Sequence, residues 1–333
     1  MATIKDIAKE TGLGLATISS YLNGGNVREK NRVKIEKAIA DLHYEVNETA
    51  RNLKTNCSQM IGAVIPELDS SFVAKVMSTA EDLLLQKGYA LLVCDCRSDP
   101  EREKEAIDFL VRKRVDGLIN IPVDESGASL KKFARTGKPI VLVDRVTDRI
   151  ACDTVCTKNK EALYLAVEKL IDAGHERIGM IAGPSRIQAA RSRREGYRLA
   201  LEAHGIKLDN SYLFEGDDSI RSGIKGAARL LADHPDITAI VVSNSAMSQG
   251  AIIGLNELGI SIPDRVSIIG FDNPEFARAV NPRMTILQQP VEEIGRRAAE
   301  LMLRRLSGDK ENNPEHIWLD TSLIEGKSIR RMK

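Results

Sequence analysis

The sequence predicts a small all-α head followed by a larger α/β body of two lobes. Residues 3–44 contain three short helical patterns, the first two separated by Gly12. From residue 58 onward, short apolar runs alternate with amphipathic helical patterns in two successive series. Apolar strands separated by helices are typical of parallel sheets that are covered on both faces. Two series of this kind predict two similar parallel-sheet lobes.

Length and composition are those of a globular protein without special chemistry. The 333 residues are 43% hydrophobic, enough for several buried cores, and the net charge of +1 does not by itself indicate a nucleic-acid partner. Five cysteines without a CxxC pair favour reduced thiols over disulfides or a zinc site. We expect no metal and no cofactor. The chain shows neither a signal peptide nor an apolar run that could span a bilayer, so we expect a cytoplasmic protein with no membrane partner.

The head opens with a capped helix. Thr3 followed by Asp6 reads as an N-cap with an acidic first turn, and the helix is expected to end near Thr11. Gly12 stands where the chain turns sharply, because glycine adopts a positive φ without steric cost. A second helix is expected over residues 15–22.

The third helical pattern places Ile35, Ala38, Ile39 and Leu42 on one stripe, which completes a very small core. Two helices about a glycine turn have the spacing of a helix-turn-helix, although a plain helical hairpin gives the same spacing. A dinucleotide-binding loop is not favoured, because Thr17 stands where the third glycine is needed and no strand precedes it.

Residues 44–55 form a short helical pattern between head and body, with Asn47 as a cap and Ala50 and Leu53 on one face. A helix this short is not stable alone in water. The segment is therefore either a partly ordered linker or a hinge that becomes helical when it binds something.

The stretches "TIKDIAKETGLGLATISSYLNG", "IEKAIADLHY" and "NETARNLKT" resemble the DNA-binding head and hinge of the LacI/GalR family of bacterial transcription regulators. "GHERIGMIAGP", "RREGYRLAL", "GLNELGISIPDRVSIIGFDN" and "TILQQPVEEIGRRAAELML" resemble the effector domain of that family. The resemblance implies a helix-turn-helix DNA-binding domain (1–46), a hinge (47–57) and an effector-binding and dimerisation domain (58–333). The body is then periplasmic-binding-protein-like, with two Rossmann-like lobes: an N-lobe of residues 58–158 and 289–319 and a C-lobe of residues 159–288 and 320–333.

The resemblance further implies that the second helix reads the major groove of a pseudo-palindromic operator and that Leu53 enters the minor groove. Ser20 departs from the arginine usual at its position, so we expect an operator that differs from the commonest half-site at that base. The residues expected to contact DNA are Thr3, Leu15, Ala16, Thr17, Ser19, Ser20, Tyr21, Asn23, Arg28, Asn31, Asn47, Ala50, Leu53 and Lys54.

In the body, polar residues follow the predicted strands, and ligands of open α/β sheets bind beyond the carboxyl ends of strands. An Asp or Asn after a strand can also cap the next helix. Taken with the family resemblance, the expected effector-binding residues are Ser70, Ser71, Phe72, Asp144, Arg191, Arg193, Asp218, Asn244, Asp272 and Gln289.

Two departures from the family pattern bear on the effector. Ser245 stands where an Asp is frequent, and Asp218 stands where an aromatic residue is frequent. The crowded Arg186, Arg191, Arg193 and Arg194 favour an anionic effector such as a sugar acid, unless these arginines are simply solvated.

The resulting interpretation is a DNA-binding regulator, a repressor controlled by a sugar or sugar-derivative effector and acting as a homodimer. No leucine heptads follow the last strand-like run, "HIWLDTSLIEG", which favours a dimer over a tetramer, and Trp318 in this run reads as a core residue. One alternative is a catabolite-control-type regulator with a protein corepressor, and another is a cytosolic solute-binding sensor, which leaves the head unexplained. No arrangement of nucleophile, base and oxyanion donor indicates an enzyme.

Overall fold

The computed structural model describes residues 2–22, 24–44, 57–147, 149–308 and 313–332. Within it the chain divides into two compact units, Met1–Ser58 and Gln59–Lys333. Five of the expected DNA contacts lie outside the described residues: Asn23, Asn47, Ala50, Leu53 and Lys54.

The head consists of three helices, α1 (Ile4–Thr11), α2 (Leu15–Leu22) and α3 (Glu29–Asp41). At the start of α1, the carboxylate of Asp6 accepts hydrogen bonds from the backbone N–H and the hydroxyl of Thr3, at 2.8 and 2.7 Å. Gly12 ends α1 with φ +66°, the left-handed conformation that its position in the sequence predicts. Short helices and tight turns thus form where the local sequence favours them.

The core of the head is small. Ile7, Ile18 and Ile35 are fully buried, Ala38 is nearly so, and the stripe residue Ile39 packs against them. Each helix alone is too short to be stable, so this apolar contact holds the head together.

The first lobe contains a six-stranded sheet in the order β11-β5-β4-β3-β1-β2, and all its neighbouring strands run parallel. Its strands are β1 (Met60–Ile65), β2 (Ala90–Asp95), β3 (Gly117–Asn120), β4 (Ile140–Val143), β5 (Asp153–Thr157) and β11 (His316–Leu319). Its helices are α5 (Ser71–Gln86), α6 (Pro100–Lys113), α7 (Lys131–Ala134) and α13 (Val291–Leu306).

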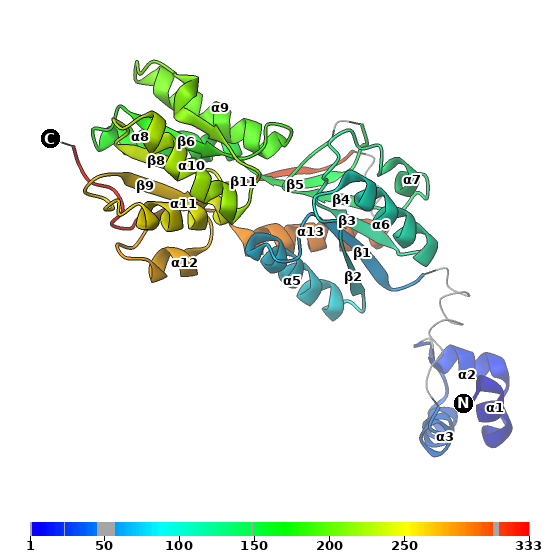
Figure 1. The fold of residues 1–333 in the computed structure, drawn as a ribbon. Helices are drawn as coiled ribbons and strands as arrows, with labels where there is room; N and C mark the ends of the chain where they lie inside the picture. The colour runs from blue at the N-terminus through cyan, green and yellow to red at the C-terminus, as the bar shows by residue number, and fades with distance from the viewer. Residues whose placement is uncertain (1, 23, 45–56, 148, 309–312, 333) are drawn as a thin grey trace. The chain divides into compact units, whose positions relative to one another are not determined.

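Helices cover both faces of this sheet (Figure 1). Ile61, Ala63 and Ile65 of β1 point into the core formed with α5 and α13, whereas Val64 points into the core formed with α6 and α7. Because successive side chains of a strand point to opposite faces, an unbroken apolar run serves both cores.

The second lobe repeats the arrangement with the strand order β12-β10-β9-β8-β6-β7. Its strands are β6 (Ile178–Ala182), β7 (Leu213–Glu215), β8 (Ala239–Val242), β9 (Ser267–Phe271), β10 (Thr285–Gln288) and β12 (Ser322–Ile324). Its helices are α8 (Asn159–Asp172), α9 (Gln188–Ala203), η1 (Asn210–Tyr212), α10 (Ile220–Asp233), α11 (Ser245–Glu257) and α12 (Pro274–Ala279). Helices α8 and α9 pack on one face and α10, α11 and α12 on the other (Figure 1), while β12 pairs antiparallel with β10.

The chain passes between the lobes at three places: from β5 to α8, from β10 to α13 and from β11 to β12. The run "HIWLDTSLIEG" therefore supplies a strand to each sheet. The expectation that Trp318 is a core residue is wrong. It lies on the edge strand β11 and is 48% exposed, because side chains alternate along a strand and its neighbours Ile317 and Leu319 are the ones that pack against the core formed with α5 and α13.

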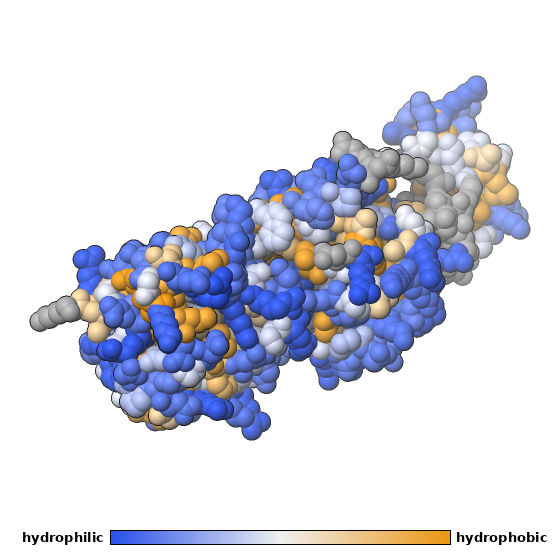
Figure 2. Space-filling view, turned by 90° about the horizontal axis from the view of Figure 1, so that it is seen from above, coloured by the Kyte–Doolittle hydropathy of each residue, from blue (hydrophilic) through white to orange (hydrophobic). Residues whose placement is uncertain are grey.

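No helix among the described residues is long and apolar enough to cross a membrane. The face of the body seen in Figure 2 is mainly hydrophilic, with several groups of apolar residues among the polar ones.

Candidate functional site

A cavity of about 1210 Å³ lies at the carboxyl ends of the strands of both lobes. Nine of the ten expected effector-binding residues line it: Ser70, Ser71, Phe72, Asp144, Arg193, Asp218, Asn244, Asp272 and Gln289. We call this cavity the cleft. Parallel strands whose carboxyl ends share one edge gather these residues from distant parts of the sequence.

Three acidic residues at strand or loop ends enter the cleft through sharp backbone turns. Asp144, Asp218 and Asp272 have φ values of +64°, +69° and +54°. This left-handed conformation is unfavourable for most residues but is tolerated by Asp, and it occurs often at functional sites. All three residues line the cleft at these positions.

Arg193, on α9, is the most deeply buried cation of the cleft. Its Nε donates to Asn159 Oδ1 at 2.7 Å, its Nη1 donates to the Ser243 carbonyl at 2.6 Å, and its guanidinium lies 4.0 Å from the centre of the Phe271 ring. Burial lowers the pKa of Arg193, and the three cleft aspartates oppose that shift. The three carboxylates thus stabilise the charged form of the buried guanidinium.

Gln289, which follows β10, links the cleft to the first crossover between the lobes. Its backbone N–H and its Nε2 both donate to the carboxylate of Asp272, at 2.9 and 2.7 Å, and its Oε1 accepts from Thr157 Oγ1 at 2.8 Å. Burial raises the pKa of Asp272, and these hydrogen bonds oppose the rise. The chain therefore holds Asp272 in a fixed orientation before any ligand binds.

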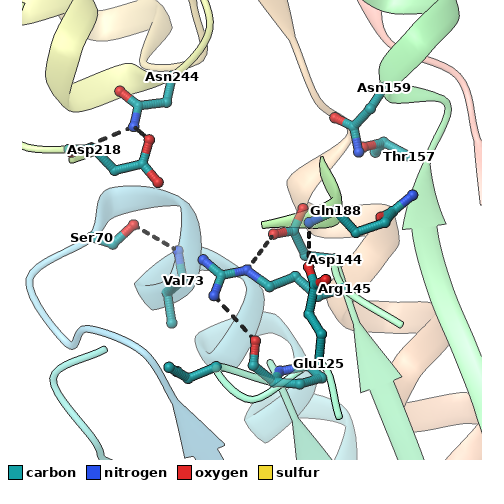
Figure 3. Close-up of polar contacts among 12 residues, drawn as sticks. Ser70, Val73, Glu125, Asp144, Arg145, Thr157, Asn159, Gln188, Asp218 and Asn244 are labelled. Carbon is teal, nitrogen blue, oxygen red and sulfur yellow. Dashed lines mark hydrogen bonds and ion pairs between the residues drawn. The ribbon is translucent and has the colours of Figure 1, made fainter. Parts of the chain in front are cut away.

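Two expected contacts also cap helices. Asn244 Oδ1 accepts from the backbone N–H of Met247 at 2.7 Å, which caps α11, while Asn244 Nδ2 donates to Asp218 Oδ1 at 2.6 Å (Figure 3). The hydroxyl of Ser70 accepts from the N–H of Val73, which caps α5. The capping and ligand-binding interpretations are thus compatible, since one side chain serves the helix and still lines the cleft.

Of the four clustered arginines, Arg186 and Arg193 line the cleft, and Arg191, Arg193 and Arg194 are held by protein groups. Arg191 is absent from the cleft lining and pairs with Glu125 at 2.7 Å, and Arg194 pairs with Glu215 at 2.7 Å. Together with buried Arg193, three of the four arginines are committed to protein groups. These three arginines have protein partners, so the prediction of an anionic effector now depends on Arg186 at the cleft.

Glu125 connects the two lobes. It lies in the loop after β3, and its carboxylate accepts from the backbone N–H of Gln188 at the start of α9 and from Arg191 Nη2. Figure 3 shows the hydrogen bond between Glu125 and Gln188, and also Arg145, whose guanidinium approaches Asp144 at 3.8 Å. The sequence gives no periodic signal for the contact between Glu125 and α9.

The loop that carries Glu125 is held by Glu103 of α6, which is fully buried. Its carboxylate accepts from the N–H groups of Val123 and Asp124, both at 3.0 Å, and from Asn120 Nδ2 and Ser129 Oγ at 3.1 and 3.2 Å. Buried carboxylates need such partners, so Glu103 fixes the position of the loop.

In the head, the start of α2 carries the exposed residues of the predicted reading surface. Leu15 is 45% exposed and Ala16 is exposed, whereas Thr17 and Ser20 are partly buried. The Tyr21 hydroxyl donates to Glu36 Oε1 at 3.0 Å. The expected contacts Thr3, Ser19 and Asn31 are partly exposed or exposed, and Arg28 is exposed. Arg32, beside them, pairs with Glu29 at 2.7 Å.

Sequence reasoning missed Arg145, Asn159 and Glu125. Arg145 directly follows the predicted strand end at Asp144, so its position could have indicated a cleft residue.

No group of three metal-binding side chains occurs among the described residues. The five cysteines, all among the described residues, form no disulfide with one another, and burial raises the pKa of Cys96 to about 11 and that of Cys152 to about 12.

Comparison with known proteins gives matches over both units. Residues 3–47 match the family described as bacterial regulatory proteins, lacI family, and residues 58–324 match periplasmic binding proteins and sugar binding domain of LacI family. The chain belongs to the LacI family. The HTH-type transcriptional repressor PurR of Actinobacillus pleuropneumoniae serotype 5b is 32% identical over 334 residues, covering 100% of this chain and 99% of the relative.

Among solved structures, the Lac repressor dimer bound to operator and the anti-inducer ONPF has a TM-score of 0.88 and 27% identity, covering 99% of both chains. A complex of the transcriptional regulator CelR with cellobiose has a TM-score of 0.76 and 26% identity, covering 98% of this chain and 100% of that one. This LacI-family chain is thus a DNA-binding transcription regulator with a helix-turn-helix head and a two-lobed body.

Proposed function

We propose that this LacI-family protein is a cytoplasmic transcriptional repressor that binds an operator as a homodimer and changes its operator affinity when a small polyhydroxylated effector occupies the cleft. The observation that carries the proposal is the cleft itself, a cavity of about 1210 Å³ that both lobes line with oriented polar groups. Ligand sites of this kind combine a preformed cavity with a few fixed polar side chains. No catalytic step forms part of the proposal.

The effector acts by population shift. Both lobes contribute cleft residues, Asp144 from the first and Arg193 from the second, so an effector that contacts both favours one angle between the lobes. We infer that this angle sets the separation of the two heads in the dimer. Leu15, Ala16 and Ser20 are the proposed base-reading residues, and Leu53 is the proposed minor-groove wedge.

Operator selection from random duplexes tests the function directly. The full-length protein should enrich a pseudo-palindromic site, and a member of a sugar panel that raises its melting temperature should also shift its affinity for that site. Light scattering should give the mass of a dimer. The proposal fails if the protein prefers no duplex over random competitor, or if every stabilising sugar leaves operator affinity unchanged.

Mutations separate the two halves of the mechanism. Leu53→Ala should weaken operator binding strongly and leave effector binding intact, because inserting Leu53 bends the duplex and so permits the contacts that offset the cost of bending. Phe72→Ala should weaken effector binding while the unliganded protein still selects the operator, because Phe72 lines the cleft and is only partly buried. A Phe72→Ala protein that binds and responds to the effector as the wild type does would count against the cleft as the effector site.

A further inference from the structure

The charged side chains deep in the cleft do not balance. We call Asp144, Arg145, Arg193, Asp218 and Asp272 the charged cluster. All five line the cleft, and each is buried or mostly buried. Two guanidiniums face three carboxylates, so the cluster carries one surplus negative charge when all its members are ionised.

The surplus negative charge can be assigned to one residue, Asp218. Asp144 has Arg145 at 3.8 Å, and Asp272 is held by two hydrogen bonds from Gln289. Asp218, in contrast, has as its hydrogen-bond partner the neutral amide of Asn244 at 2.6 Å. Arg193 and Arg145 act on Asp218 only through longer-range attraction, and burial, which is the larger effect, raises its pKa.

The structure is built around the Asp218 carboxylate. Asn244 cannot reverse its amide, because its Oδ1 caps α11 and its Nδ2 must therefore face Asp218. A Cβ on Gly183 would lie 2.6 Å from Asp218 Oδ1, so the absence of a side chain at Gly183 makes room for the carboxylate. Figure 3 shows the second carboxylate oxygen of Asp218 pointing away from Asn244. One oxygen is thus held by the protein, and the other is left for a ligand.

We propose that Asp218 recognises a positively charged amino group, so that the effector of this cleft is an amino sugar or a polyhydroxylated amine of similar size. The inference rests on the proposed function and names the chemical class of its effector. An ammonium group would compensate the carboxylate that the protein leaves without a cation, and buried ions are costly unless they are paired. A neutral hydroxyl would leave the charge in place, and a carboxylate or phosphate would add a repulsion.

The remaining cleft residues fit the rest of such a ligand. Arg193 and Asp272 are oriented hydrogen-bonding groups for ring hydroxyls, and Phe72 supplies apolar surface for a ring face. Only the end of the ligand near Asp218 needs the positive charge.

Calorimetry on the full-length dimer with matched probes tests the inference. Each series contains a neutral hexose, its 2-amino derivative and its uronic acid, in the gluco, galacto and manno configurations, at pH 7.5. In the series that fits the cleft, the amino sugar should bind at least about tenfold more tightly than the neutral sugar, as close charge pairs do at interfaces, and the uronic acid should bind most weakly.

The isosteric variant Asp218→Asn should reduce the ratio of amino-sugar to neutral-sugar affinity to about one, because the hydrogen-bonding shape stays and the charge is lost. Asp233→Asn, an exposed acid at the end of α10, is the matched control and should keep the wild-type ratio. A neutral or acidic member that binds more tightly than the amino sugar in every series overturns the inference, and so does an unchanged ratio in Asp218→Asn.

Operator binding separates this inference from the function on which it rests. A protein that selects an operator but binds no amino probe overturns the amine assignment and leaves the repressor function standing. A protein that selects no operator overturns the function itself, whatever the probes show.

Discussion

Replacing Arg193 by methionine should destabilise the body severely. The substitution removes two charge-assisted hydrogen bonds, to Asn159 Oδ1 and to the Ser243 carbonyl, and the contact with the Phe271 ring. Each such bond contributes about 1.5–3 kcal/mol and the ring contact about 0.5–2 kcal/mol, while the desolvation cost of the guanidinium disappears. The free energy of unfolding of the body should therefore fall by about 3–5 kcal/mol, the usual result of removing one partner of a buried charge cluster.

Arg198→Met is the matched control, because Arg198 lies on the same helix and makes two ion pairs at 2.8 and 2.7 Å on the surface. Exposed ion pairs contribute little to stability, so Arg198→Met should lower the free energy of unfolding by less than about 1 kcal/mol. Urea titrations followed by far-UV circular dichroism measure both losses, provided that the m-values agree. Equal losses in the two variants would refute the claim that the contacts of Arg193 are buried and strong.

The pH dependence gives a second check on the same substitution. Burial raises the pKa values of Asp218 and Asp272, and Arg193 opposes both shifts. Both carboxyls already bind protons more readily in the folded state than in the unfolded chain, and without Arg193 their pKa values rise further, so the variant gains more stability than the wild type as the pH falls. The stability difference between wild type and Arg193→Met should therefore shrink from pH 8 to pH 5, while that of Arg198→Met should not.

Three further predictions concern other parts of the chain. Ile35→Ala should cost about 2–5 kcal/mol in the small head core and abolish operator binding while the melting of the body is unchanged; operator affinity close to wild type would contradict this. Glu125→Ala removes the acceptor of the Gln188 N–H, so the first turn of α9 should exchange its amide hydrogens about tenfold faster, as expected for a lost cap, and α10 should not. Burial lowers the pKa of His175, so the unfolded chain binds its proton first and the body should lose stability as the pH falls from 7.5 to 5.5. His175→Gln should flatten that dependence, and equal slopes in both proteins would exclude His175 as its source.

Much of the fold could be predicted because its signals are local. The capping pair Thr3 and Asp6, the turn at Gly12 and the apolar runs of β1 and β9 each specify their own element within a few residues. Strands β5, β7 and β10 lack a comparable local signal. They are short, and the run "DTVCT" of β5 contains polar residues that nevertheless become buried between neighbouring strands.

The site was predictable only in part. Residues that follow strands, such as Asp144 and Asp272, could be identified because the carboxyl ends of parallel strands mark the ligand edge of a sheet. The arginines of α9 show the limit of this reasoning. Their clustering in the sequence suggests an anion site, but neighbouring positions on a helix point in different directions. Arg191 and Arg194 form ion pairs with Glu125 and Glu215 instead.

The sequence by itself determined the elements of this protein, their alternation and its family, because helix caps, turns and hydrophobic periodicity act over a few residues. Only the tertiary structure decided which charges meet in the cleft. Whether Asp218 faces a cation or the neutral amide of Asn244, and whether Trp318 is covered or exposed, depends on elements far apart in the chain. Coulomb and desolvation energies depend on distance and burial in space, and the order of residues along the chain does not specify either one.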